Sequence, residues 1–430
     1  MSDNRIEWIH GRRVWDSRGR PTVEAEVQLR SGVRGRAIAP AGASTGSGEA
    51  LDLRDGGPRF AGMGVDTACT AINDEISRNL GGLDIADQHA LDGRLVALDA
   101  TPDRRHLGGN AMVATSMALL HARAAAAGLP LWKVLAGDRK VRMPLPEIQI
   151  FGGGAHAGRR MDVQDFMVMC PAATSFAEAL EWTAEIYLAA GASLKKAGRL
   201  RGVADEGGYW PVFSSNEQAL DTLTQAILDA GLKPGSQVGI SLDIAASEFG
   251  CEGRYELALE NRTLDSDEMI AMLGGWLDRY PILSIEDPLA EDDPAGFQKF
   301  CQAYGSRCQV IGDDFLVTNA DRVRAAAESG SVNAVLIKPN QAGTLSEAHA
   351  ALEAGKSAGF ATIVSARSGE TEDVTIAHLA VGWDAGQLKV GSFSRSERMA
   401  KWNEVLRIEE SLGSEARFWG WDALPFHRRP

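Results

Sequence analysis

Short apolar runs recur after Arg142, and this repetition constrains the fold more than any other feature of the sequence. They occupy residues 145–150, 166–170, 238–245, 282–285, 309–311, 334–337, 361–364 and 387–390. From residue 238 onward, amphipathic stretches separate most of them, for example 265–280, 319–330 and 345–359. Strands that alternate with helices in this way indicate parallel βα units, and so many units favour a closed βα barrel.

The first part of the chain has a different pattern. Residues 22–29 alternate apolar and polar side chains, which predicts a half-buried strand, and residues 66–80 and 110–128 show helical spacing. Strands followed by helices indicate an α+β domain that ends near residues 137–140. We therefore predict an α/β protein of two domains, with the α+β domain over residues 1–140 and the barrel over residues 141–430.

The charge balance excludes some classes of partner. The chain has 44 Lys and Arg against 58 Asp and Glu, a net charge of −14. Nucleic acid and anionic membranes do not attract such a surface, so we expect neither as a partner. The first ten residues have no apolar region of a secretory signal, and the five cysteines form no CxxC pair. These features predict a cytoplasmic protein with reduced thiols.

Charged residues end five of the apolar runs. Three are the acids Asp243, Glu286 and Asp313, and two are Lys338 and Lys389. In a βα barrel the carboxyl ends of the strands meet at one mouth, where active sites lie. Converging carboxylates repel one another unless a cation neutralises them, and an all-oxygen ligand set indicates Mg²⁺. Alternatively, each acid caps the helix that follows its strand.

Seven motifs resemble those of enolase. They are DSRGRPTVE at residues 16–24, PAGASTG at 40–46, DEGG at 205–208, SIED at 284–287, GDD at 312–314, LIK at 336–338 and RSGETED at 367–373. The resemblance extends from residue 14 to residue 413. It implies a small α+β domain that caps an enolase-type βα barrel with an antiparallel second strand. It also implies a homodimer or a higher homo-oligomer, with an ion pair between Glu24 of one subunit and Arg407 of another.

The resemblance also implies residue roles. Asp243, Glu286 and Asp313 correspond to ligands of one Mg²⁺, and Ser44 corresponds to a ligand of a second Mg²⁺ that arrives with substrate. The corresponding general base at C2 of 2-phosphoglycerate is Lys338, and the general acid at C3 is Glu206. Arg367 and Ser368 would contact the phosphate and Lys389 the substrate carboxylate, and His156 lies where the family has an active-site histidine. We expect Mg²⁺ and Lys389 to lower the pKa of Lys338.

Several residues depart from the enolase pattern. Ala366 replaces a histidine near the leaving hydroxide, and Asp165, which follows the retained Gln164, replaces a glutamate that works beside the general acid. Gly152 and Ala155 stand where enolase has an asparagine and a polar residue, and Ala41 stands where it has a serine. Withdrawing a catalytic carboxylate by about 1 Å can cost ~10²-fold in rate.

These changes gather at the end of the site where water would leave. We therefore expect a specialised enzyme, carboxyphosphonoenolpyruvate synthase of phosphonate natural-product pathways, in which Ala366, Ala155 and Gly152 make room for a larger phosphorylated or phosphonylated carboxylate. One alternative is an ordinary phosphopyruvate hydratase, which converts 2-phosphoglycerate into phosphoenolpyruvate and water. Another is a non-catalytic binding protein with an enolase fold. Retention of all three metal-ligand acids and both lysines argues against the latter.

Overall fold

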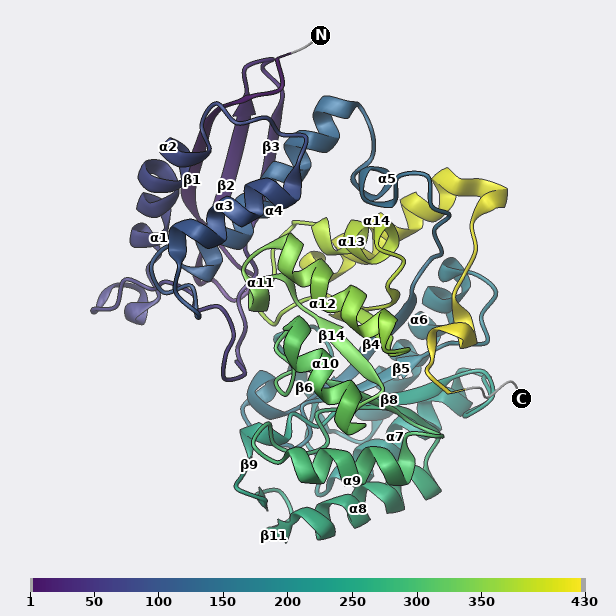
Figure 1. The fold of residues 1–430 in the computed structure, drawn as a ribbon. Coiled ribbons are helices and arrows are strands. Elements are labelled where there is room, and N and C mark those ends of the chain that lie inside the picture. The colour runs from purple at the N-terminus through teal and green to yellow at the C-terminus, as the bar shows by residue number, and fades with distance from the viewer. Residues whose placement is uncertain (1–2, 427–430) are drawn as a thin grey trace.

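The structure is a computed structural model that describes residues 3–426. Its N-terminal part is an antiparallel sheet, covered by helices (Figure 1), of the strands β1 (Ile6–Trp15), β2 (Pro21–Leu29) and β3 (Arg34–Ile38). The helices are η1 (Arg59–Gly62), α1 (Asp66–Ala71), η2 (Ile72–Ile76), α2 (Ser77–Leu80), α3 (Gln88–Asp99), α4 (Gly109–Ala127) and α5 (Leu131–Ala136). The predicted order of strands and then helices is confirmed.

Strand β2 departs from the predicted half-burial. Residues 21–25 are all buried, and only the second half of the strand alternates. Helix α4 packs across β2 and β3, and Thr22 donates a hydrogen bond to the carbonyl of Ala39 at 2.7 Å. Glu24 is buried because Arg12, on the neighbouring strand β1, donates to its carboxylate. The polar side chains Thr22 and Glu24 are therefore buried together with hydrogen-bond partners from the backbone and from β1.

The helix predicted over residues 66–80 contains one wide turn. Elements α1, η2 and α2 follow one another without a break, and η2 is a π-helical turn. At this turn the Asn73 side chain accepts from the Gly11 amide at 2.8 Å and donates to its carbonyl at 3.0 Å. A π turn leaves backbone groups that need other partners, and its location at the contact with β1 explains why periodicity alone did not reveal it.

A closed barrel of eight strands forms the second part of the chain. Its strands are β4 (Leu145–Gly152), β5 (Asp165–Met169), β8 (Gly239–Asp243), β12 (Ile282–Glu286), β13 (Gln309–Gly312), β14 (Ala334–Ile337), β15 (Ala361–Ser365) and β16 (Gly386–Ser392). Strand β16 pairs with β4 and closes the barrel, and β5 is antiparallel to both of its neighbours. The expected antiparallel second strand is confirmed.

Helices surround the barrel, and two short β-structures branch from it (Figure 1). The longer helices are α6 (Phe176–Lys196), α7 (Asn216–Asp229), α8 (Ser266–Arg279), α9 (Pro294–Tyr304), α10 (Ala320–Ser329), α12 (Leu345–Ser357), α13 (Thr375–Gly382) and α14 (Ser396–Leu412). The short elements are η3 (Gly154–Ala157), β6 (Leu200–Val203), β7 (Tyr209–Pro211), η4 (Ala246–Glu248), β9 (Gly250–Cys251), β10 (Arg254–Leu257), β11 (Arg262–Asp265), α11 (Pro339–Ala342), η5 (Gly413–Glu415) and η6 (Gly420–Ala423).

Local sequence signals set the ends of several helices. Asp265 caps α8 in a reciprocal capping box with Glu268, and Ser175 accepts from the Glu178 amide at 3.1 Å at the start of α6. Helix α10 begins after Asn319 and ends at Gly330, which is in the left-handed conformation. The ends of α8 and α10 agree closely with the predicted ranges because capping depends on residues near in sequence.

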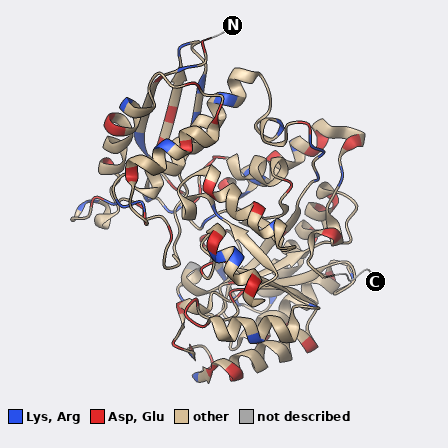
Figure 2. Ribbon diagram, viewed as in Figure 1, with Lys and Arg blue, Asp and Glu red and all other residues tan. Residues whose placement is uncertain are grey.

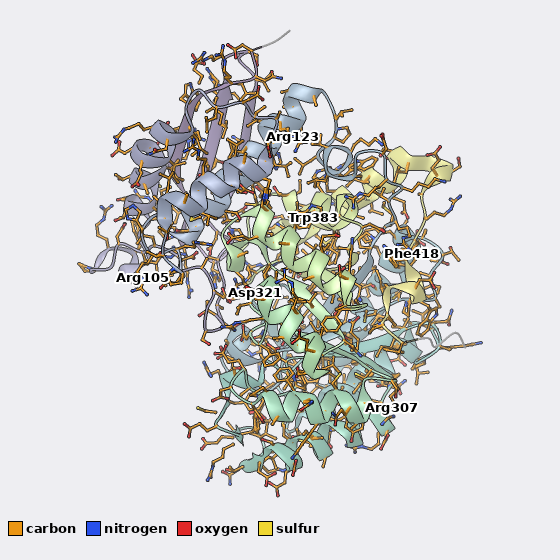
Figure 3. All side chains as sticks on the ribbon, viewed as in Figure 1. Arg105, Arg123, Arg307, Asp321, Trp383 and Phe418 are labelled. Atoms are coloured by element: carbon orange, nitrogen blue, oxygen red, sulfur yellow. The ribbon has the colours of Figure 1, made fainter. Side chains whose placement is uncertain are left out.

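The C-terminal segment packs against the end of the barrel remote from its mouth. Leu424 and Phe426 bury against Leu145, Met169 and Leu283 at the starts or ends of barrel strands, and Phe418 (labelled in Figure 3), Trp419 and Trp421 pack beside them. Gln387 donates to the carbonyl of Ala423 at 2.8 Å. The aromatic residues of this segment therefore cover the floor of the barrel.

Truncating this floor should destabilise the protein. Phe426→Ala removes a ring that is 5% exposed, and we expect a loss of about 3–5 kcal/mol in the free energy of unfolding. Leu228→Ala is the control, because Leu228 is 50% exposed and its truncation should change stability by about 0.5 kcal/mol or less. Urea unfolding of both variants measures the difference, and equal midpoints would contradict the assignment of Phe426 to the core.

Charged residues of both signs are spread over the outer helices (Figure 2). No helix within residues 3–426 has both the length and the apolar character needed to cross a bilayer.

Candidate active site

Three buried acids meet at the barrel mouth. Asp243 and Glu286 are the last residues of the neighbouring strands β8 and β12, where they lie opposite each other in the register, and Asp313 directly follows β13. Their exposed fractions are 3%, 0% and 6%. The parallel strands bring these residues together because their carboxyl ends meet at one rim. The convergence expected from the sequence is therefore present.

Two lysines lie among these acids. Lys389, on β16, places its Nζ 2.9 Å from Asp243 Oδ2 and 2.7 Å from Glu286 Oε2. Lys338, directly after β14, donates a hydrogen bond to Asp313 Oδ2. Each ammonium group thus neutralises part of the carboxylate set, and both lysines are almost completely buried. Removing one of these residues would leave its partner as an uncompensated buried charge, which is strongly destabilising.

The pKa values follow from burial and from this pairing. Burial raises the pKa of Glu286 well above its usual range, and the Asp243 charge raises it further. Burial, the largest single influence, lowers the pKa of Lys338, but the Asp313 and Glu286 carboxylates together raise it, and the net shift is upward. The expected lowering of the pKa of Lys338 by Mg²⁺ stays a prediction; Lys389 does act to lower this pKa, while the neighbouring carboxylates raise it.

The acids offer a ligand set that suits a hard cation. Glu286 Oε1 is buried and accepts no hydrogen bond from any of residues 3–426, and the same holds for Gln164 Oε1. Gln164 donates its amide hydrogen to Asp243 Oδ2 at 3.0 Å, so its free oxygen lies near the acid pair. Carboxylate and amide oxygens without donors are the ligands that Mg²⁺ prefers. The residues present therefore fit a magnesium ion.

A second cluster of acids has a structural explanation. Carboxylate oxygens of Asp287, Asp313 and Asp314 lie within 4.8 Å of one another. However, the two oxygens of Asp287 accept the amides of Asp313 at 3.0 Å and of Asp314 at 2.8 Å. Burial, reinforced by Asp313, raises the pKa of Asp314 to about 8. Asp287 therefore orders the turn that carries Asp313, and we assign the cation site to the other set.

The loop at residues 41–49 reaches from the N-terminal domain into the mouth. Ala41 exchanges two backbone hydrogen bonds with Gly369, each of 2.9 Å. Arg367 donates to the carbonyl of Ser44 at 2.9 Å and to Glu49 at 3.0 Å. A Cβ at Gly42 would lie 2.0 Å from the Arg367 guanidinium, so only glycine permits this approach. Ser44 and Arg367 are thus brought together at the mouth.

Helix α14 holds the turn that carries Arg367 and Ser368. Arg398 is fully buried and donates to the carbonyls of Arg367 at 2.6 Å and Val390 at 2.9 Å, and also to that of Ser368. The Ser368 hydroxyl accepts from Arg18 at 3.3 Å. Sequence reasoning missed Arg398, because an arginine on an amphipathic helix carries no signal that it faces inward.

The end of the site where water was expected to leave contains Glu206 and Asp165, and both are buried. We call this part of the mouth the acid end. Gln149 donates to Asp165 Oδ1 and accepts the Gly208 amide at 2.8 Å, so it connects β5 to the loop that carries Glu206. Asp165 Oδ2 lies 3.9 Å from Lys389 Nζ. The backbone of His156 lies in η3, and its side chain is outside the described part of the structure. The shortened acid therefore still faces the site.

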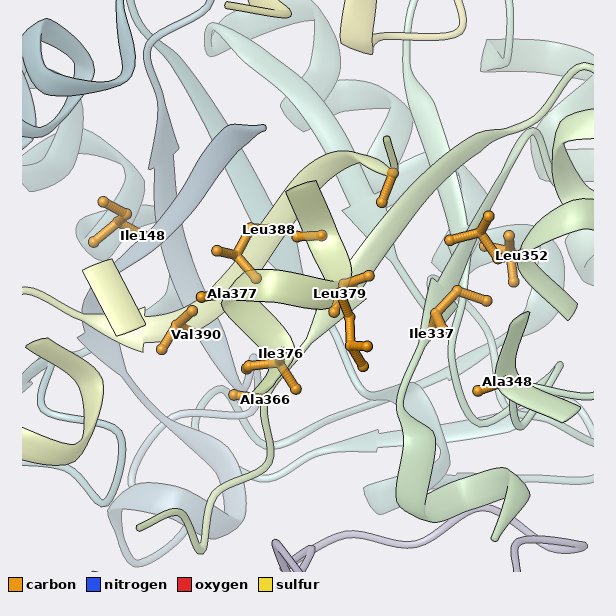
Figure 4. Close-up of a cluster of buried hydrophobic side chains, with 14 of the residues drawn as sticks. Ile148, Ile337, Ala348, Leu352, Ala366, Ile376, Ala377, Leu379, Leu388 and Val390 are labelled. Carbon is orange, nitrogen blue, oxygen red and sulfur yellow. The ribbon is translucent and has the colours of Figure 1, made fainter. Parts of the chain in front are cut away.

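Gly152 and Ala366, two of the residues expected to make room for a larger substrate, differ in their surroundings. A Cβ at Gly152 would lie 2.5 Å from the Cβ of Ala204, so this glycine is filled by its neighbour and opens no space. Ala366 lines the mouth, but it also belongs to the cluster of apolar side chains that includes Ile376 (Figure 4). The expectation that Gly152 enlarges the substrate site is wrong.

A polar chain that sequence reasoning missed connects the loop to the lysine. Gln341 donates to Asp313 Oδ1 at 3.0 Å and to Glu49 Oε1 at 3.2 Å. Its own oxygen accepts from Thr318 at 2.6 Å, and Thr318 accepts the Lys338 amide at 2.9 Å. These residues come from the loop at residues 41–49, the segment after β13, and helix α11 with the lysine before it, and only tertiary structure brings them together.

Ser47 holds the loop at residues 41–49 in place through hydrogen bonds to Glu291 and Arg322. Its amide and hydroxyl donate to Glu291 at 2.9 and 3.0 Å, and its carbonyl accepts from Arg322 at 2.9 Å. Glu291→Gln replaces the carboxylate with a single weaker acceptor, the amide oxygen. We therefore expect the loop to open more often and KM to rise about threefold to tenfold, which corresponds to the loss of a charge-assisted hydrogen bond or less. Steady-state kinetics and limited proteolysis near residue 45 measure the change.

The control for this variant is Asp292→Asn, which alters the adjacent acid. Asp292 accepts from Cys251 and from the Glu252 amide, away from the loop. Its replacement should leave both KM and the cleavage rate near residue 45 unchanged. Equal cleavage in the Glu291 variant and the unaltered protein would show that Glu291 does not hold the loop.

Comparison with known proteins agrees with this fold. Residues 6–135 match the family model described as enolase, N-terminal domain, and residues 140–425 match enolase, C-terminal TIM barrel domain. The protein named Enolase 1 of Desulfitobacterium hafniense (strain Y51) is 48% identical over 421 residues, which cover 97% of this chain and 96% of that protein. A capped barrel with buried acids and lysines at its mouth defines an enzyme of the enolase superfamily. This chain belongs to the enolase family.

Proposed function

We propose that this enzyme is a phosphopyruvate hydratase that interconverts 2-phosphoglycerate and phosphoenolpyruvate with Mg²⁺. The observation that carries the proposal is the contact of Lys338 and Lys389 with three buried carboxylates at the barrel mouth. The 48% identity with Enolase 1 over nearly the whole chain supports the same reaction.

Asp243, Glu286 and Asp313 would hold one Mg²⁺, and Ser44 would contribute to a second site that forms with substrate. When bound, these ions supply positive charge to the substrate carboxylate, which carries a second negative charge once the C2 proton has left. Lys389 would bind the same carboxylate, and Arg367 with Ser368 would bind the phosphate. The net charge of −14 makes such local cations necessary for an anionic substrate.

Lys338 would take the C2 proton. A base must be neutral, and in the structure Asp313 favours the charged lysine. Once the Asp313 charge is engaged elsewhere, burial together with Arg367 and Lys389 favours the neutral amine, because each of them acts to lower the pKa of Lys338. The proton balance at this residue therefore depends on the charge state of its neighbour.

Glu206 would donate a proton to the hydroxide that leaves C3. Asp165 lies in the same cavity and is oriented by Gln149. The cavity thus retains two carboxyl groups at the acid end despite Ala366 and the shortened side chain of Asp165. This arrangement supports dehydration more than it supports the specialised synthase.

The specialised carboxyphosphonoenolpyruvate synthase has no support beyond the changed residues themselves. Gly152 opens no space, and the comparison favours an ordinary enolase. A homodimer is part of the proposal, with Glu24 and Arg407 at the interface. Within the chain, Arg407 is exposed and pairs only with the neighbouring Glu404 among the described residues.

The test is an assay with 2-phosphoglycerate and Mg²⁺, followed by absorbance of phosphoenolpyruvate and by phosphorus NMR. We expect turnover on the order of 10–10² s⁻¹, which is usual for an enzyme. A parallel reaction contains phosphonoformate. Failure to form phosphoenolpyruvate, together with a new phosphorus species in the parallel reaction, would overturn the hydratase in favour of the synthase.

A further inference from the structure

Glu147 is a buried acid inside the barrel that has no part in the site described above. It lies on β4, is 0% exposed and accepts a hydrogen bond from the Ser241 hydroxyl at 2.9 Å through Oε2. Its other oxygen, Oε1, is buried and accepts no hydrogen bond from residues 3–426. An unsatisfied buried carboxylate oxygen costs stability, so its presence needs an explanation.

Lys389 is the cation on the strand next to Glu147. Strands β16 and β4 pair in parallel, and in this register Lys389 lies directly opposite Glu147. Burial raises the pKa of Glu147 to about 7, and the positive charge of Lys389 acts in the opposite direction. The two side chains therefore share the interior of the barrel and interact electrostatically, although Lys389 directs its ammonium toward Asp243 and Glu286.

We propose that Glu147 is a positioning residue for Lys389, the anion that retains its ammonium group when a divalent cation engages Asp243 and Glu286. This inference rests on the proposed function only in naming the cation and the substrate. It assigns a role to a carboxyl group that touches neither.

The physical reason is charge balance in a medium of low dielectric constant. An ammonium group and a divalent ion repel each other when they bind the same carboxylates, so Lys389 needs another counter-charge close by. Asp165, whose Oδ2 lies 3.9 Å from Lys389 Nζ, and Glu206 also attract the ammonium group, but both belong to the substrate cavity. Glu147 has a free oxygen, lies opposite Lys389 and would hold the lysine in the barrel wall, from which it reaches the substrate carboxylate.

The proposal predicts a small effect on stability and a large effect on binding. Without divalent ions, Glu147→Met removes a carboxyl group with one unsatisfied oxygen but leaves the Ser241 hydroxyl without its acceptor, so the melting temperature in EDTA should change by no more than a few degrees. With Mg²⁺, the same variant leaves Lys389 without its counter-charge. The Kd for Mg²⁺ and the KM for 2-phosphoglycerate should each rise about tenfold or more, with a smaller change in kcat.

A control separates this role from general packing. Gln309 is also fully buried in the barrel interior, where it donates to Ser284 at 2.9 Å and to Gln387 at 3.0 Å. Gln309→Met leaves these groups without a partner, so it should lower the melting temperature with and without Mg²⁺. It should leave the Kd for Mg²⁺ unchanged.

A double-mutant cycle tests whether Glu147 acts through Lys389. Calorimetry measures Mg²⁺ binding to Glu147→Met, Lys389→Met and the double variant in the absence of substrate. If Glu147 acts through the lysine, its replacement should change the Kd by less than twofold once Lys389 is methionine. A tenfold effect that persists in the double variant would show direct attraction of the ion and overturn the proposal.

An unchanged Kd in the single variant Glu147→Met would overturn it as well. Neither calorimetry nor melting requires turnover of 2-phosphoglycerate. These measurements therefore remain decisive if the hydratase proposal itself fails.

Discussion

Lys338→Ala should abolish exchange of the C2 hydrogen of 2-phosphoglycerate with solvent deuterium. Loss of a general base costs about 10²–10⁴-fold in rate, and we expect the upper part of this range because no other described lysine lies against Asp313. The same variant removes the ammonium group that competes for Asp313 Oδ2. Mg²⁺ should therefore bind at least as tightly as in the unaltered protein.

Proton NMR of 2-phosphoglycerate in D₂O measures the exchange, and calorimetry measures Mg²⁺ binding in parallel. Lys299→Ala is the control, since Lys299 is an exposed lysine that pairs only with Asp267 among the described residues. Exchange at the native rate in the Lys338 variant would assign the base to another residue. Loss of exchange together with loss of Mg²⁺ binding would indicate a damaged site instead.

Glu286→Gln should lose Mg²⁺ binding by at least ~10²-fold. Removal of a residue that merely supports a metal ligand costs about 10–10²-fold in affinity, so removal of a ligand should cost more. The variant also leaves Lys389 with Asp243 as its remaining close partner, which strengthens the lysine as a competitor for that acid. Calorimetry in the absence of substrate measures the affinity.

The neighbouring variant Asp287→Asn discriminates between the two clusters of acids. Asp287 accepts two backbone amides of the turn at residues 313–314. An amide retains only one acceptor oxygen, so we expect a loss of about 1–3 kcal/mol in stability with a much smaller change in Mg²⁺ affinity. The reverse pattern, in which Asp287→Asn loses the metal and Glu286→Gln retains it, would move the cation site to Asp287, Asp313 and Asp314.

Much of the site was visible in the sequence because it depends on where strands end. Asp243, Glu286 and Asp313 end parallel strands, and a barrel brings such ends together whatever the details of packing. The ends of the helices could also be predicted from the sequence, since capping residues such as Asp265 act on residues three positions away. The motifs at residues 367–373 and 40–46 added the proposed phosphate-binding end and the loop.

Tertiary structure alone decided how the charges pair. Lys389 contacts two acids from other strands, and Lys338 lies against Asp313, whose charge opposes the effect of burial on the pKa of Lys338. These results depend on distances between residues remote in sequence, and Coulomb energies inside a protein change steeply with distance and burial.

Three further residues show the same limit. Arg398 and Gln341 act on loops far from them in sequence, and Gly152 is filled by Ala204 rather than open to substrate. The sequence by itself determined the barrel, the positions of the proposed metal ligands and the family, because these follow from local periodicity and short motifs. Tertiary packing decided which lysine pairs with which buried acid, because this pairing depends on contacts that no local sequence pattern encodes.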